Sequence, residues 1–122
     1  MKKFNFVKFN GVYPRGDTKI GINKSGLIRL SAGFCRDTHT LEYNYAVLYY
    51  DKKNFTMALK FTKRKEEGIL KVTKDGTGAT ISAVTFMKAN NLSLKSYAGR
   101  YDWKKIMISE IGEVFIIDLT KK

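Results

Sequence analysis

The chain has 122 residues and is 43% apolar, which is enough for one compact domain with its own core. Its single cysteine, Cys35, excludes an intrachain disulfide and any cluster of cysteine metal ligands, and no apolar run approaches the roughly 20 residues that a membrane-spanning helix needs. We therefore expect a soluble, cytoplasmic protein. The 23 Lys and Arg against 11 Asp and Glu give a net charge of +12.

This positive charge is unevenly distributed along the chain. Residues 1–65 hold fourteen basic and four acidic residues, a net +10, whereas residues 66–122 hold nine and seven, a net +2. Concentrated positive potential attracts polyanions and supplies the sequence-independent part of nucleic-acid affinity. The charge thus favours a nucleic-acid partner.

The first half of the chain reads as strands around one short helix. Apolar and polar residues alternate over 4–9, which indicates a strand, and turn residues follow over 10–17. The predicted elements are then a hairpin of 18–22 with 27–30, a helix from Ala32 to about Thr38 capped by Ser31, and a hairpin of 45–50 with 55–61.

The second half shows a similar order. Strands at 69–72 and 79–81 flank a Gly-rich turn, and Ser82 is placed to cap a helix that runs to about Ala89. We expect a loop over 93–100 and a last hairpin of 104–108 with 113–119.

Two segments share a Ser-Ala start and a Leu ten positions later. They are Ser31-Ala32 to Leu41 and Ser82-Ala83 to Leu92, and each follows a turn that contains Lys and Gly. We interpret this as an internal repeat of two ββαββ units, 18–65 and 66–122, inside one domain 1–122 whose residues 1–17 form an N-terminal strand and turn.

The repeated turn resembles that of the AbrB/SpoVT/MazE/MraZ-type DNA-binding domains, which combine two ββαββ units. The residues that carry the resemblance are Lys24-Ser25-Gly26-Leu27-Ile28-Arg29-Leu30-Ser31 and Lys74-Asp75-Gly76-Thr77-Gly78-Ala79-Thr80-Ile81-Ser82. The family's helix-entry Pro is Ser31 and Ser82 here, and the Arg that usually follows the turn glycine is Leu27.

This resemblance implies a mainly β (α+β) fold, a swapped-hairpin-like β barrel with short helices. It also implies a small DNA-binding protein, a transcriptional regulator of bacterial, phage or mobile-element kind, that binds duplex DNA and assembles as a homodimer. The positions we assign to nucleic-acid binding, from this resemblance and the surrounding basic residues, are Arg15, Lys19, Lys24, Arg29, Arg36, Lys71, Lys74 and Lys88.

A second resemblance is to the PC4/Whirly single-stranded DNA-binding proteins. It rests on Gly78-Ala79-Thr80-Ile81-Ser82 with Phe86 and Leu92. Aromatic rings next to basic residues can stack on unpaired bases. On this alternative, the aromatic residues near turns that would stack are Tyr13, Tyr97, Tyr101 and Trp103.

Residues for catalysis or metal binding are few. His39 is the only histidine, and no Gly-rich segment has the spacing of a phosphate-binding or dinucleotide-binding loop. We therefore expect no enzyme, no metal and no cofactor. A third hypothesis stays open, a non-catalytic protein-interaction module, antitoxin-like or inhibitory, whose basic face meets an acidic partner.

Overall fold

The computed structural model describes residues 3–6, 8 and 18–122. Its elements in chain order are β1 (Ile20–Ile22), β2 (Leu27–Leu30), α1 (Ala32–Thr38), the 3-10 helix η1 (Thr40–Glu42), β3 (Tyr45–Asp51), β4 (Thr56–Thr62), β5 (Leu70–Lys71), β6 (Thr73–Asp75), β7 (Gly78–Ser82), α2 (Val84–Ala89), α3 (Leu94–Tyr97), β8 (Gly99–Tyr101), β9 (Lys104–Ile108) and β10 (Gly112–Asp118).

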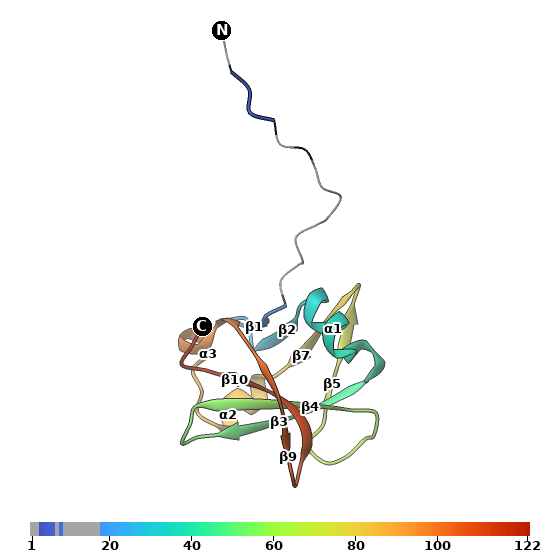
Figure 1. Cartoon of the computed structure of the whole chain (residues 1–122). Helices are drawn as coiled ribbons and strands as arrows, with labels where there is room; N and C mark the ends of the chain where they lie inside the picture. Colours follow the sequence, from blue (N-terminus) through green and yellow to red (C-terminus); the bar gives the residue numbers. More distant parts are fainter. Residues whose placement is uncertain (1–2, 7, 9–17) are drawn as a thin grey trace.

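The strands form two five-stranded antiparallel sheets. Sheet A has the order β6-β7-β2-β1-β8, and sheet B has the order β5-β3-β4-β10-β9. Figure 1 shows sheet A lying across sheet B, with the two faces opposed. Each sheet joins strands from both halves of the chain, because β2 pairs with β7 and β4 pairs with β10.

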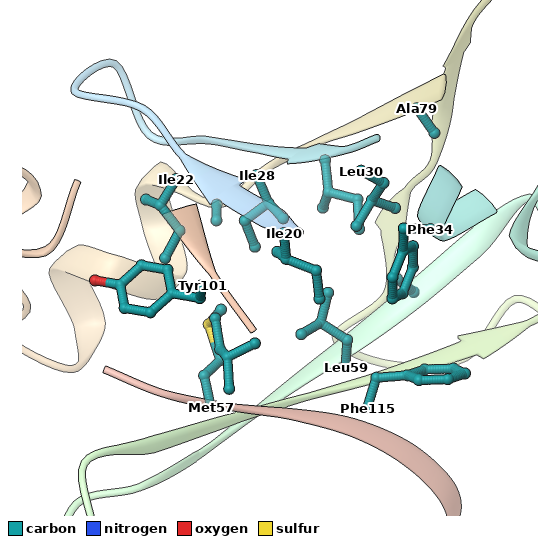
Figure 2. Packing of buried hydrophobic residues seen from close by; sticks show 14 of the residues in the cluster. Ile20, Ile22, Ile28, Leu30, Phe34, Met57, Leu59, Ala79, Tyr101 and Phe115 are labelled. Atoms are coloured by element: carbon teal, nitrogen blue, oxygen red, sulfur yellow. The ribbon is translucent and has the colours of Figure 1, made fainter. Parts of the chain in front are cut away.

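One hydrophobic core fills the space between the sheets. Sheet A contributes Ile20, Ile28 and Tyr101, all fully buried, and sheet B contributes Met57 and Leu59. Figure 2 shows these side chains meeting from the two sides. The helices add buried residues to the same cluster, Phe34 from α1 and Met87 from α2. The fold is thus a two-layer sandwich whose short helices complete its core.

Local sequence signals explain the first unit. In the turn between β1 and β2, the Asn23 side chain accepts hydrogen bonds from the backbone N–H groups of Ser25 and Leu27, each at 3.0 Å. Gly26 follows with a φ of +92°, a conformation that glycine adopts readily. Ser31 then caps α1, its Oγ accepting from the Phe34 N–H at 3.1 Å. The predicted first hairpin, helix and cap are confirmed.

The prediction of a closed β barrel is wrong. Over the described residues the strands make two separate sheets, and no ladder joins one sheet to the other. The mainly β class is confirmed, as are the hairpins β3–β4 and β9–β10.

Three local predictions also need correction. Ser82 does not cap α2, because β7 continues through it in register with Leu27, so that Ala83 becomes the helix-preceding residue and has no side-chain cap. The expected loop at 93–100 contains α3 and the start of β8. In the segment 4–9, the described residues 4–6 and 8 form no strand, and the other positions lie outside the described residues.

Candidate nucleic-acid interface

The outward face of sheet A carries polar and basic residues, in contrast to its inward face. Alternation along β1 and β2 produces this difference, since successive side chains of a strand point to opposite faces. Ile20, Ile22 and Ile28 are buried toward the core, whereas Arg29 between two buried neighbours is exposed. The basic residue is therefore held on a rigid central strand.

A cross-strand row brings two arginines together on this outward face. The register pairs Gly21 of β1 with Arg29 of β2 on one side and with Arg100 of β8 on the other. Arg29 in turn pairs with Thr80 of β7. Neighbouring strands lie about 4.8 Å apart, so the two arginine backbones stand roughly 10 Å apart with only the Gly21 backbone between them. Their guanidinium groups thus border an open strip of sheet.

This strip belongs to a groove of about 470 Å³. Its basic lining residues are Lys19, Arg29 and Arg100, and its one acidic lining residue is Asp75. The remaining lining residues are Gly21, Leu30, Ser31, Ala32, Thr77, Gly78, Ala79 and Thr80. A smaller hollow of about 200 Å³ adjoins it and is also lined by Gly21, Arg29 and Arg100.

The far wall of the groove is the tight turn between β6 and β7. Gly78 begins β7 there, and a Cβ added to it would lie 2.9 Å from the Leu30 carbonyl oxygen. Only glycine allows β7 to approach the end of β2 so closely. A Cβ at Gly21 would instead meet its nearest neighbours at 3.8 Å, an ordinary contact. The Gly21 backbone would therefore accept a side chain, which would stand in the strip between Arg29 and Arg100.

The electrostatics of the groove are dominated by exposed cations. Lys19 forms an ion pair with Asp102 at 3.8 Å, and the Asp102 side chain is 90% exposed. Such a solvent-exposed pair contributes little energy and is screened by salt. With Lys19, Arg29 and Arg100 against Asp75, the lining has a net charge of +2.

The structure separates the other predicted nucleic-acid-binding residues. Lys24 is exposed in the turn at the end of the β1–β2 hairpin. Arg36 is on α1 and pairs with Asp37 at 3.4 Å. Lys71 lies on β5 of sheet B, Lys88 is in the last turn of α2, and the Lys74 Nζ donates a hydrogen bond to the Asn44 Oδ1 at 3.0 Å. Arg15 lies outside the described residues. Among the predicted set, only Lys19 and Arg29 line the groove.

The structure encloses one predicted stacking residue, Tyr101, in the core and buries another, Trp103, in part. Tyr101 is fully buried, and its hydroxyl donates a hydrogen bond to the Tyr97 carbonyl oxygen at 2.5 Å. Burial also raises the pKa of this hydroxyl. Trp103 donates from Nε1 to the Thr18 carbonyl at 2.7 Å, and its ring meets Phe34 edge-on at 5.0 Å. The Tyr101 ring therefore presents no open face to a base, whereas Trp103 also lines two surface hollows. Tyr97 is half-buried, and Tyr13 lies outside the described residues.

Arg100 is the groove residue that sequence reasoning missed. It stands in a strand of three residues, Gly99–Tyr101, which is too short for alternation to be recognised. Its place in the groove follows only from the pairing of β8 with β1, which lie almost 80 positions apart in the sequence. No local pattern in the sequence therefore points to it.

Comparisons with known protein families, with curated proteins and with solved structures find no match. In the described part of the chain, no three His, Cys, Asp or Glu side chains gather where they could hold a metal ion. Among those same residues, no helix has the length and apolar character needed to cross a membrane.

Proposed function

We propose that this protein is a non-catalytic nucleic-acid-binding protein that holds duplex DNA against the outward face of sheet A. The observation that carries the proposal is the row in which Arg29 and Arg100 border the Gly21 backbone beside the groove. Exposed guanidinium groups on a rigid sheet suit phosphate oxygens, which they bind bidentately. The surrounding net charge of +12 adds long-range attraction for a polyanion.

The pairing of the central strands supports a relation between the two halves. Ser31 and Ser82 are 51 positions apart, so the repeat matches each residue of the first unit with the residue 51 positions later. Ile28 then corresponds to Ala79, and Leu30 corresponds to Ile81. The ladder between β2 and β7 pairs Ile28 with Ile81 and Leu30 with Ala79, so exchanging the two units leaves these pairs unchanged. Arg29 and Thr80 correspond to each other in the repeat and also pair with each other, so this pair lies at the centre of the ladder. This supports two related ββαββ units around a pseudo-twofold axis, in keeping with the AbrB-type order of elements, although the strands lie in two sheets.

The burial of Tyr101, one of the predicted stacking residues, favours duplex over single-stranded DNA. Single-strand binding without sequence preference relies on aromatic rings that stack on bases. The groove offers charged and hydroxyl side chains instead, among them Arg29 and Thr80, and these suit a phosphate backbone.

The test compares two double variants that make the same change in net charge. Arg29→Glu with Arg100→Glu alters the two arginines that border the groove, and Lys104→Glu with Lys105→Glu alters exposed residues on β9. Fluorescence anisotropy with a labelled duplex and with one of its single strands measures affinity. We expect the first variant to weaken duplex binding at least tenfold more than the second. Equal losses would remove sheet A as the binding face, and tighter single-strand binding would favour the PC4-like alternative.

A wild-type protein that binds neither DNA form would overturn the proposal itself. Binding that does not change with salt would equally remove the phosphate-contact mechanism, because released counterions make such binding salt-dependent. Capture of an acidic protein by the same face, without any DNA binding, would indicate the protein-interaction hypothesis.

A further inference from the structure

A hollow rich in aromatic side chains lies between the β3–β4 turn, the end of α2 and α3. Its volume is about 270 Å³, and it shares no lining residue with the groove on sheet A. Figure 1 shows the three segments near one end of the molecule. We call it the aromatic hollow, and its aromatic and polar lining residues are Tyr50, Phe55, Tyr97, Lys52, Asn90 and Asn91.

The fold holds the two tyrosine walls of the hollow in place. Tyr50 on β3 meets Phe86 of α2 edge-on, with ring centroids 6.5 Å apart. Tyr97 ends α3, and its backbone carbonyl oxygen accepts the hydrogen bond from the buried Tyr101 hydroxyl. Because these walls are fixed in the free chain, a ligand would bind without first ordering them.

Phe55 is the unusual residue of the hollow. Its φ is +50°, a left-handed conformation that bulky residues rarely adopt, and it is 45% exposed. The Leu119 N–H donates to the Phe55 carbonyl oxygen at 2.9 Å, which fixes this backbone. Asn91 has a φ of +55°, so two of the three non-glycine residues with positive φ in the described part of the chain line one hollow. Such conformations gather at functional sites, and a ring kept exposed at this cost indicates a binding surface.

The polar groups of the hollow are suited to donate hydrogen bonds. Within the described part of the chain, the hydroxyls of Tyr50 and Tyr97 have no hydrogen-bond partner. Burial, together with the nearby Tyr97 and Asp51, raises the pKa of the Tyr50 hydroxyl, so it keeps its proton at neutral pH. Lys52 adds a positive charge, and none of the described carboxylates lines the hollow. These groups favour a ligand that offers acceptors and carries no positive charge.

A proline-rich peptide segment has this chemistry. In the polyproline II conformation its apolar rings dock on aromatic side chains, and its carbonyl groups have no internal hydrogen bonds and are free to accept. One turn of three residues is about 9 Å long, and the hollow is slightly smaller than the roughly 300 Å³ that a drug-sized ligand needs. A nucleotide would also stack, but its phosphate would meet a single exposed cation, Lys52. The observations therefore favour the peptide.

We propose that the aromatic hollow is a docking site for a proline-rich segment of a partner protein. Phe55 and Tyr97 contact the proline rings, and the hydroxyls of Tyr50 and Tyr97 donate to the carbonyl oxygens of the segment. Because the contact covers about one turn of the peptide, we expect a dissociation constant of order 0.1–1 mM. The site uses neither Arg29 nor Arg100, so it is independent of the proposed DNA binding.

The test is an NMR titration of the ¹⁵N-labelled full chain with an acetylated oligoproline of about nine residues, which forms three turns. A Gly-Ser peptide of the same length is the control ligand. We expect the oligoproline to shift the amide signals of Lys52, Asn91 and Tyr97 in a saturable way, and the control peptide to leave them unchanged. The amide signals of Arg29 and Arg100 should not move with either peptide.

Phe55→Asn removes the exposed ring and inserts a residue that tolerates a positive φ better. We expect it to raise the dissociation constant about tenfold or more and to leave the urea midpoint unchanged or higher. Phe6→Asn makes the same change at a residue that is 87% exposed and outside the hollow, and should leave the dissociation constant within about twofold. A lower urea midpoint with unchanged peptide binding in Phe55→Asn would mean that Phe55 is structural, and would overturn the proposal.

A second pair of variants tests the hydroxyl donors. Tyr97→Phe should weaken peptide binding several-fold, whereas Tyr49→Phe removes a hydroxyl that points to the other face of β3 from Tyr50 and should not. A wild-type chain whose signals do not shift at about 10 mM oligoproline would overturn the proposal. So would equal effects of Phe55→Asn and Phe6→Asn, or tighter binding of adenosine monophosphate at the same amides, which would indicate a nucleotide site.

Discussion

Replacing Arg29 by alanine gives the most direct quantitative test of the groove. Arg29 is exposed on β2, so its removal leaves the core intact and should change stability by no more than about 1 kcal/mol. Its effect on DNA affinity follows from counterion release, in which each neutralised phosphate of a duplex adds about −0.9 to the slope of log K against log salt.

Three cations line the groove, Lys19, Arg29 and Arg100, and together they predict a slope of about −2.7. Raising the salt from about 50 to about 200 mM should then weaken duplex binding by roughly 40-fold. In the Arg29→Ala variant two cations remain, the slope falls to about −1.8, and the same change in salt weakens binding by only roughly 12-fold. Basic residues elsewhere add to both slopes equally, so the difference of about 0.9 is the robust quantity.

The assay is fluorescence anisotropy of a short labelled duplex titrated at several salt concentrations. Lys104→Ala provides the control, since Lys104 is an exposed cation on sheet B. Its slope should match that of the wild type. An Arg29→Ala slope equal to the wild-type slope, with Lys104→Ala reduced instead, would refute the reasoning that places the phosphate contacts on sheet A.

Further predictions concern the groove, the thiol and the core. The backbone should tolerate Gly21→Val, because a Cβ there meets its nearest neighbours at 3.8 Å. This variant should reduce duplex affinity several-fold and leave the slope of log K against log salt unchanged. An unchanged affinity would contradict a role for the open strip. Burial raises the pKa of the Cys35 thiol from 9.0 to about 11, so the folded chain keeps a proton that the unfolded chain loses. The free energy of unfolding should therefore decrease as the pH rises from 9 toward 11, by up to about 1.4 kcal/mol per unit, and urea titrations of Cys35→Ala should lack this component. Phe34→Ala should lower the free energy of unfolding in urea by about 3–5 kcal/mol, because the buried Phe34 ring lies 5.0 and 5.4 Å, between ring centroids, from Trp103 and Phe115. Phe6→Ala is the control, since the Phe6 residue is 87% exposed and its loss should leave the free energy of unfolding almost unchanged.

The sequence predicted the elements whose signals are local. Alternating residues marked β3 and β4, and the Asn23 to Gly26 turn and the Ser31 cap gave the first hairpin and helix. Each of these depends on side chains that contact their own neighbours in the chain, which is why a linear pattern is sufficient.

The arrangement of the hairpins depends instead on long-range pairing. The junction of β2 with β7 and of β4 with β10 encloses the core, and no local pattern specifies which strand edges meet. The same pairing buries Tyr101, so this predicted stacking residue cannot contact a base. It also extends β7 through Ser82, so Ser82 does not form the predicted helix cap. It also brings Arg100 beside Gly21. Arg100, one of the two arginines that line the groove, could therefore not be predicted from the sequence.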